Sequence, residues 1–227
     1  MLAPAVEAEI AALAARYGQP RRLAVELEGA PFSPLNMDDR FAEVCMVLRR
    51  PNGKLITAVK TYYPDGAFRL LTGGVGHGES IGVALLREVA EETGLDVVVR
   101  RFLAVVEYSL TLGQADKETN RQGEREKGRR LNSFTPSPPR PLAPSRSPSF
   151  ATFAFLLDEI GGTLHARDES EQIGAFRELE VAELPAQAEL LANLPDTFHR
   201  KIRGSWRDWG RFRAVVHRVV FEMLSAE

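Results

Sequence analysis

The chain has 227 residues, of which 44% are hydrophobic and 26% are charged, as in an ordinary soluble globular protein. Its 29 basic and 31 acidic side chains give a formal net charge of −2, which excludes a globally basic nucleic-acid binder. The single cysteine, Cys45, excludes an intrachain disulfide, and its apolar surroundings predict a buried strand thiol rather than a nucleophile. We see no secretion signal and no apolar run long enough to span a membrane, and therefore expect a cytoplasmic protein.

The first part of the chain alternates between a helical pattern and strand patterns. Residues Pro4–Tyr17 are rich in alanine and predict a helix, and Arg22–Glu28 alternates as a short strand. Strand-like runs follow at Arg40–Arg50 and Lys54–Tyr63. The Asn-Gly pair between these two runs is a strong signal for a hairpin.

A glycine-rich stretch precedes the clearest helix of the sequence. Residues Gly73–Gly78 are expected to form a loop, and Ser80–Thr93 a helix that Ser80 caps and Gly94 ends. Beyond it, Leu95–Leu112 and Phe150–Leu157 are rich in β-branched and aromatic residues, which predicts further strands.

The composition changes abruptly between those strands and again near the end of the chain. Residues 113–149 are charged and then rich in Pro, Ser and Arg, so we expect a disordered insertion. Residues 195–226 follow a helical pattern with basic side chains between the apolar ones, and we expect the apolar stripe to pack on the domain. The alternative is a basic face that serves a phosphate-rich ligand or a partner subunit. We assign residues 1–36 to an N-terminal appendage and residues 37–227 to the main domain.

Three glutamates gather on one side of the helix predicted before Gly94. Glu88, Glu91 and Glu92 are spaced i, i+3 and i+4, and like charges at this spacing repel one another unless a cation compensates them. Carboxylate oxygens suit Mg²⁺ or Mn²⁺, whereas a solvated acidic face is the alternative. Arg87 can hold these carboxylates in place. The residues expected on the opposite, core-facing side are Leu86, Val89, Ala90 and Thr93.

The stretch from Gly73 to Leu95 reads GGVGHGESIGVALLREVAEETGL and resembles the signature of the Nudix hydrolases at every defined position. The resemblance does not identify a subfamily. It implies an α/β/α sandwich around a mixed β-sheet, which here would carry the disordered insertion and a C-terminal amphipathic helix. It also implies metal-dependent hydrolysis of the diphosphate linkage in a nucleoside diphosphate derivative. The products would be a nucleoside monophosphate and a phosphorylated remainder.

The resemblance also implies roles for single residues. Glu88 and Arg87 would be catalytic, with the arginine orienting the carboxylates. Glycine residues let backbone approach a phosphate closely, so Gly73 and Gly74 are expected at the substrate. The expected metal ligands are Glu79, Glu88, Glu91, Glu92 and the backbone carbonyl of Thr72.

Many members of the family add a glutamate from a late loop, as a metal ligand or as the general base. The candidates here are Glu169 and Glu171, although a plain acidic surface loop is the alternative. The expected cofactor is Mg²⁺ or Mn²⁺, and the expected partner a small substrate of the nucleoside diphosphate type. We expect no membrane or nucleic-acid partner, and a homodimer stays open. The rival hypothesis is a module of the same fold that senses nucleotides or acts as a scaffold without catalysis.

Overall fold

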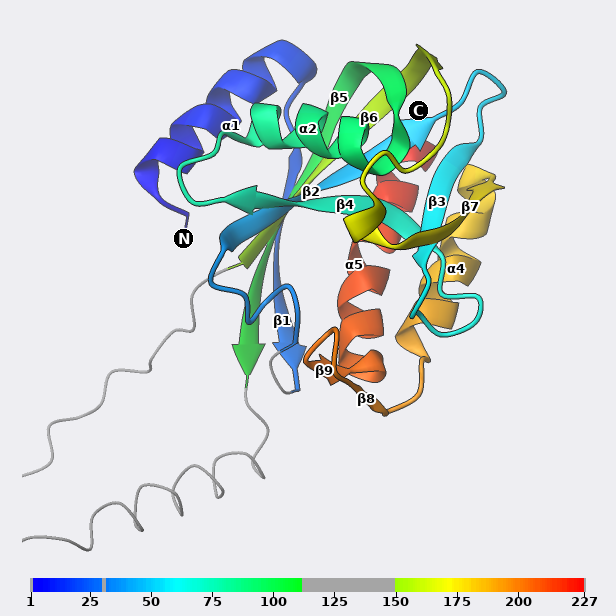
Figure 1. The fold of residues 1–227 in the computed structure, drawn as a ribbon. Coiled ribbons are helices and arrows are strands. Elements are labelled where there is room, and N and C mark those ends of the chain that lie inside the picture. The colour runs from blue at the N-terminus through cyan, green and yellow to red at the C-terminus, as the bar shows by residue number, and fades with distance from the viewer. Residues whose placement is uncertain (1, 30–31, 112–149, 227) are drawn as a thin grey trace, which may run out of the picture.

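The computed structural model describes residues 2–29, 32–111 and 150–226, and these residues build one mixed sheet between two layers of helices (Figure 1). The strands are β1 (Arg21–Glu28), β2 (Arg40–Arg49), β3 (Leu55–Lys60), β4 (Arg69–Gly76), β5 (Leu95–Thr111), β6 (Phe150–Gly162) and β7 (Ile173–Leu179). They lie in the order β1-β5-β6-β2-β4-β3-β7. The pairs β1–β5 and β2–β6 are parallel and the others are antiparallel, so the predicted mixed sheet is confirmed.

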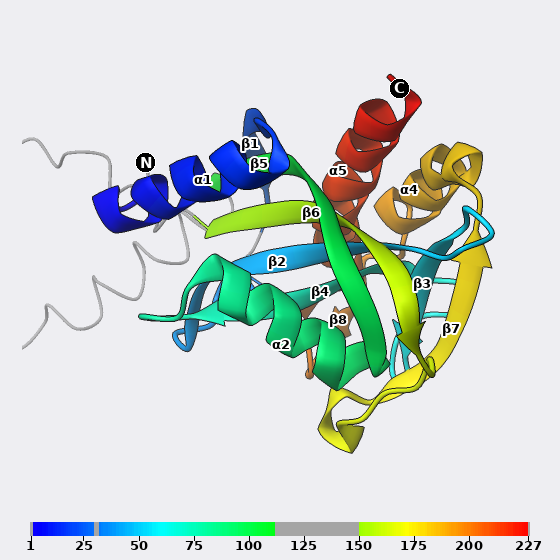
Figure 2. The same cartoon turned by 90° about the horizontal axis from the view of Figure 1, so that it is seen from above.

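Helices cover both faces of this sheet. The helices are α1 (Pro4–Tyr17), α2 (Ile81–Thr93), α4 (Leu184–Ala192) and α5 (Trp206–Ser225), with short 3₁₀ turns η1 (Glu169–Glu171) and η2 (Val181–Glu183). Figure 1 shows α1 and α2 above the sheet and α4 and α5 below it, and from above α1 lies over β5 and α2 over β4 (Figure 2). This arrangement is the predicted α/β/α sandwich.

Two apolar cores fill the space between the layers. Successive residues of β2 point to opposite faces of the sheet, as in any strand, so Val44 and Met46 join one core while Cys45 and Val47 join the other. The Cys45 thiol is buried, and burial raises its pKa to about 12, so the expected inert strand thiol is confirmed.

The helix α2 begins and ends where the sequence predicts, and Val89 and Thr93 are buried as expected, but two other residues expected in the core are not there. Leu86 is 54% exposed and Ala90 is exposed as well, so their expected place in the core is wrong. Seven residues are about two helical turns, so Glu88 lies on the same side of α2 as the buried Ile81. The side that carries the glutamates is the side that packs on the sheet.

Two further expectations about element boundaries are wrong. The glycines expected in a loop lie mostly within β4, where Gly73 and Gly74 pair with β2. The C-terminal helix begins at Trp206 rather than at residue 195, because Ser205 caps it by accepting a hydrogen bond from Arg207 N–H. The residues before it form a small hairpin of β8 (Phe198–His199) and β9 (Gly204–Ser205).

The N-terminal segment contributes to the same sheet. Strand β1 pairs with β5 along its whole length at the edge of the sheet. The division of the chain at residue 36 stays a prediction, because strand pairing does not show whether residues 37–227 fold alone. The expected disordered insertion, residues 113–149, lies outside the described residues. Among the helices that are described, none is both long and apolar enough to cross a membrane.

The contact between α4 and α5 depends on one glycine. A Cβ atom built at Gly210 would lie 2.0 Å from the backbone oxygen of Leu191, far inside any allowed contact. Since the obstructing atom belongs to the backbone, it cannot turn aside as a side chain could. The two helices reach this distance only because residue 210 has no side chain.

We predict that Gly210→Ala lowers the free energy of unfolding by about 1–3 kcal/mol, because the helices must separate to admit the methyl group. The matched control is Gly82→Ala in α2, where the nearest atom to the new Cβ is 4.0 Å away. That change should be neutral or stabilise by up to about 1 kcal/mol, since alanine is the better helix former. Urea unfolding measures both changes, and equal effects would contradict the packing argument.

The buried side chain of His217 joins α5 to β4. Leu70 N–H donates to its Nε2 atom at 3.1 Å, and its Nδ1 atom lies 2.8 Å from the backbone oxygen of Arg213. This pairing requires a neutral ring with its proton on Nδ1. Burial lowers the pKa of His217 to about 4.

We predict that His217 makes the fold less stable as the pH falls from about 6.5 to about 4. Within this window the unfolded chain binds a proton that the native ring does not accept, so the free energy of unfolding decreases as the pH falls. In His217→Gln, which keeps an acceptor but does not titrate, the decrease should be smaller by about 1–3 kcal/mol. Unfolding curves of both proteins across this window test the difference, and parallel curves would refute it.

Candidate functional site

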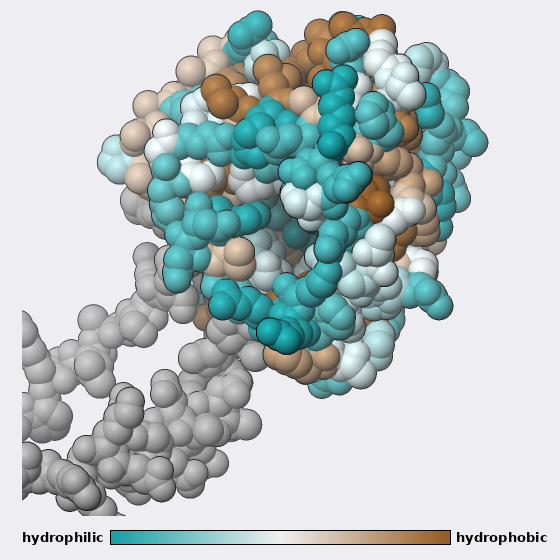
Figure 3. Space-filling model, viewed as in Figure 1, coloured by the Kyte–Doolittle hydropathy of each residue, from teal (hydrophilic) through white to brown (hydrophobic). Residues whose placement is uncertain are grey.

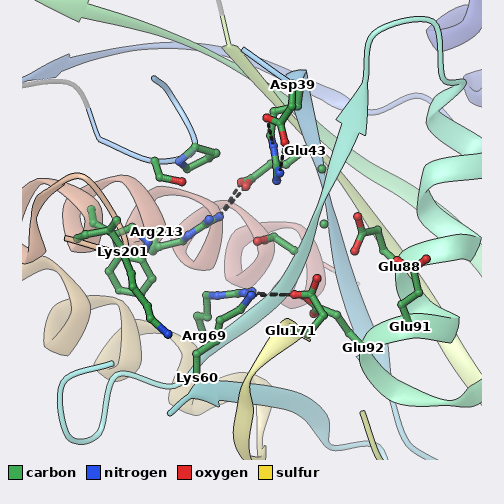
Figure 4. Close-up of a pocket in the computed structure, with 18 of the residues that line it drawn as sticks. Asp39, Glu43, Lys60, Arg69, Glu88, Glu91, Glu92, Glu171, Lys201 and Arg213 are labelled. Carbon is green, nitrogen blue, oxygen red and sulfur yellow. Dashed lines mark hydrogen bonds and ion pairs between the residues drawn. The ribbon is translucent and has the colours of Figure 1, made fainter. Parts of the chain in front are cut away.

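A cavity of about 420 Å³ opens beside α2 and reaches across β4 to α5. On the face seen in Figure 3, hydrophilic side chains surround a hollow near the centre. The close-up in Figure 4 shows the carboxylates of α2 and η1 on one side and the cationic side chains of β3, β4 and α5 on the other, where Glu43 pairs with Arg213. The cavity therefore has an acidic side and a basic side.

The acidic side contains most of the site residues predicted from the sequence. Glu88 and Glu92 are only 6% and 1% exposed, because α2 turns them toward the sheet, while Glu91 is half-buried at the opening. The predicted residues that line the cavity are Thr72, Gly73, Gly74, Glu79, Arg87, Glu88, Glu91, Glu92 and Glu171. Their functional roles stay predictions.

Arg87 connects the carboxylates of this side. Its guanidinium lies 2.8 Å from Glu79 and from Glu88, 3.0 Å from Glu91, and 2.9 Å from the backbone oxygen of Gly74. The arginine thus compensates several negative charges at once and fixes their orientation. Its hydrogen bond to Glu79 holds the pKa of that carboxyl below its ordinary value, whereas burial raises the pKa of Glu88 despite Arg87.

The two glycines at the centre of β4 leave room for charged side chains. A Cβ atom at Gly73 would lie 2.0 Å from the Glu88 side chain, and one at Gly74 would lie 2.6 Å from the Arg40 guanidinium. Glycine is therefore needed at residue 73 so that Glu88 can lie against the strand. This observation gives Gly73 and Gly74 a role in spacing, and their expected contact with substrate stays a prediction.

Glu92 is buried with an incomplete set of partners. Its Oε2 atom has no hydrogen-bond partner in the described structure, and its Oε1 atom lies 4.0 Å from Arg69. Burial raises the pKa of Glu92 to about 7, although the charges of Arg69 and Lys60 partly oppose the shift. A buried carboxylate oxygen without a partner is unfavourable, and a bound cation would satisfy it.

The late loop is held against the C-terminal end of α2. The backbone N–H groups of Arg167 and Asp168 donate to the backbone oxygen of Glu91. This oxygen lies in the last turn of the helix and has no helical partner of its own. This attachment brings Glu171 into the cavity, whereas Glu169 is exposed and is not among its lining residues. Of the two candidates from the sequence, the structure therefore places only Glu171 at the site.

Lys60 stabilises the ionised form of the Glu171 carboxyl group. Its Nζ atom lies 2.8 Å from the Glu171 carboxylate. Burial raises the pKa of this carboxyl, but the charge and the hydrogen bond of Lys60 outweigh burial, so the pKa lies below its ordinary value. Glu171 is consequently ionised at neutral pH and able to accept a proton.

The sequence analysis anticipated the basic side of the cavity only in part, through the basic face left as an alternative for residues 195–226. Arg213 of α5 is buried and pairs with Glu43 of β2 at 2.7 Å, and Glu43 also accepts a hydrogen bond from Thr152. The other cations of this side are Lys60, Arg69 and Lys201. Charged residues inside apolar strand runs, such as Glu43, were the available signal, because a charge in a buried strand needs a partner.

The donor set fits a hard divalent cation by its chemistry, since carboxylate and backbone oxygens are the usual ligands of Mg²⁺ and Mn²⁺. The unpartnered oxygen of Glu92 supports this fit. Within the described ranges, however, no three His, Cys, Asp or Glu side chains stand close enough together to hold an ion. Glu79, Glu88 and Glu91 instead bind Arg87.

Comparison with solved structures gives several likenesses at low identity. A UDP-X diphosphatase is 14% identical, with a TM-score of 0.45 over 86% of this chain and 68% of its own. The dihydroneopterin triphosphate pyrophosphohydrolase of E. coli is 17% identical, with a TM-score of 0.39 over 67% of this chain and 86% of its own. A NUDIX family hydrolase from Clostridium perfringens is 13% identical, with a TM-score of 0.40 over 82% of this chain and 99% of its own.

The match to a family model, rather than the likeness to these solved structures, identifies the family of this chain. No curated protein matches the chain. The family model of the NUDIX domain matches residues 39–201, which include the acidic side of the cavity and all of the strands except β1 and β9. The chain therefore belongs to the NUDIX family, whose members are generally pyrophosphohydrolases acting on nucleoside diphosphate derivatives.

Proposed function

We propose that this chain is a cytoplasmic, divalent-metal-dependent enzyme that cleaves the diphosphate linkage of a nucleoside diphosphate derivative. The observation that carries the proposal is the meeting of Glu171 with the carboxylates of α2 in one cavity. A base and a set of cation ligands are the two things that water attack on a diphosphate requires. The proposal does not depend on whether the chain forms a homodimer.

The α2 carboxylates are the residues that would hold the cation. Glu88, Glu91 and Glu92 supply oxygen ligands, and the Thr72 carbonyl is the backbone candidate beside them. When bound, Mg²⁺ or Mn²⁺ neutralises charge on the diphosphate and lowers the pKa of water. Before the ion binds, these acidic groups must be kept from repelling one another, and Arg87 does this through its contacts with Glu88 and Glu91.

Glu79 acts on Arg87 in this proposal. Its carboxylate accepts hydrogen bonds from Nε and Nη2 of Arg87 and from Gly76 N–H, so both of its oxygens are already engaged. A carboxylate satisfied in this way orients the arginine, which in turn orients Glu88 and Glu91. We therefore assign Glu79 to positioning before metal binding.

Glu171 is the proposed general base. It is ionised because of Lys60, and it takes a proton from the water that attacks one phosphorus of the diphosphate. The bond between that phosphorus and the bridging oxygen breaks, and the bridging oxygen leaves with the other phosphate. The products are a nucleoside monophosphate and a phosphorylated remainder.

The test of the activity is phosphate-product analysis on a panel of nucleoside diphosphate derivatives, with Mg²⁺, with Mn²⁺ and with a chelator. Hydrolysis that requires the ion is the expected result. Nucleotide binding without any product, across the whole panel and with both ions, would favour the rival hypothesis of a sensing or scaffold module.

We predict that Glu91→Gln and Glu92→Gln each lower kcat/KM by at least about 100-fold, because an amide is a much weaker ligand for a hard cation. Glu26→Gln is the control, since Glu26 is an exposed glutamate on β1 outside the cavity. Turnover at saturating Mg²⁺ is measured together with the unfolding midpoint. Near-normal turnover in either cavity variant would contradict the assignment of that residue.

We predict that Glu171→Gln lowers kcat by about 10²–10⁴-fold and changes KM by only a few-fold, as expected for the loss of a general base. Glu169→Gln is the matched control from the same turn and should retain kcat, because Glu169 does not line the cavity. Steady-state kinetics from pH 6 to pH 9 separate the two variants. Full kcat in Glu171→Gln at every pH would move the base to α2.

A further inference from the structure

The basic side of the cavity has more positive charge than its contacts require. Lys60 is paired with Glu171, but the Arg69 guanidinium has only a 4.0 Å approach to the Glu92 carboxyl group. Arg69 is 3% exposed, and its other partners are the neutral Tyr63 hydroxyl and a backbone oxygen. A buried guanidinium with so weak an ion pair is unfavourable unless an anion joins it.

Lys201 is the second cation with unused charge. It makes no ion pair with any described residue, and its hydrogen-bond partner is the neutral amide of Gln172. Its Nζ atom lies 4.6 Å from the centre of the Tyr62 ring, which holds the ammonium group at the cavity wall. Figure 4 shows Lys201, Arg69 and Lys60 on the same side of the cavity, opposite the carboxylates of α2.

Much of this wall comes from segments outside the NUDIX match to residues 39–201. The cavity-lining residues that lie outside it are Ser33, Pro34, Ile202, Trp209 and Arg213. The two flanking segments are joined, because Ser33 N–H donates to the Ile202 oxygen at 2.7 Å. The β8–β9 hairpin carries Lys201 to this junction. The cations Lys60, Arg69 and Lys201 lie within the matched residues, and the two flanking segments complete the wall beside them.

We propose that Lys201, backed by Arg69 and Lys60, binds an anionic group that the substrate carries in addition to its scissile diphosphate. This inference rests on the proposed function insofar as it calls the bound molecule a substrate. The binding itself does not require hydrolysis. The substrate class is then a nucleoside diphosphate derivative with one more negative group, either further along the phosphate chain or on the second half of the molecule. A neutral second half of the substrate leaves Lys201 without an anionic partner.

Two pairs of probes test the subsite and separate the two positions of the charge. ATP and ADP differ by one phosphate on the chain, and UDP-glucuronate and UDP-glucose differ by one carboxylate on the sugar. Dissociation constants are measured by calorimetry in a chelating buffer, so that no turnover occurs. The wild-type protein should bind the more anionic member of at least one pair more tightly by about fivefold, and that pair identifies the position of the charge.

The variants are Lys201→Met and Arg200→Met. Lys201→Met should abolish the preference within the responsive pair, whereas Arg200→Met removes an adjacent exposed charge that does not line the cavity and should leave the preference intact. The proposal is overturned if the wild type shows no preference in either pair, or if the preference survives in Lys201→Met. It is also overturned if both variants reduce the preference equally, because the effect would then be one of net charge.

The same binding data distinguish this inference from the proposed activity. If no probe is hydrolysed with Mg²⁺ or Mn²⁺ but Lys201 still controls the preference, the anion subsite stands and the activity assignment to these substrates fails. If hydrolysis is observed and Lys201→Met changes kcat/KM equally for both members of each pair, the subsite fails and the hydrolase stands.

Discussion

The site depends on the burial of negative charge between a helix and a sheet. Helix α2 turns Glu88 and Glu92 toward β4, where burial disfavours their charged forms. Two features make this tolerable. Gly73 leaves the space that the Glu88 side chain occupies, and Arg87 supplies a cation within hydrogen-bond distance of Glu88. The same packing that makes the acidic cluster costly for the fold also directs its oxygens at the position proposed for the ion.

The end of α2 extends this constraint to the rest of the cavity. Its last free carbonyls accept hydrogen bonds from the loop that follows β6, and this loop continues into η1 and Glu171. Lys60 on β3 then meets Glu171, so the proposed base, its ionising cation and the ligand helix form one connected set. A helix terminus that would otherwise leave unsatisfied groups thereby positions the proposed base.

Local sequence signals predicted the parts of the structure that depend on neighbours in the chain. The caps of α2, the hairpin between β2 and β3, and the family itself all follow from short spacings such as those of Ser80 and Gly94. The choice between Glu169 and Glu171 could not be predicted, because it depends on how η1 is attached to α2. The burial of Leu86 was misjudged for a related reason: periodicity gives the angle between side chains and does not say which side meets the sheet.

Local signals indicated only part of the basic wall, because the wall joins residues far apart in the sequence. Periodicity placed Arg213 on a basic helical face, whereas its partner Glu43 lies in β2, 170 positions away. The start of α5 could not be predicted either, because the apolar residues on both sides of Gly204 and Ser205 keep the spacing of a helix. Only the tertiary contact between the two flanking segments shows that they share a site.

The hydrogen bond between Ser33 and Ile202 has a consequence for the order in which the molecule is completed during synthesis. The carboxylates of α2 leave the ribosome well before residue 202, so a nascent chain holds the ligand helix while its cavity still lacks a wall. A product that ends before the β8–β9 hairpin would retain the acidic half and lose Lys201, Trp209 and Arg213 together. The residues proposed to hold the ion and the residues proposed to select the substrate are therefore completed at different moments of translation.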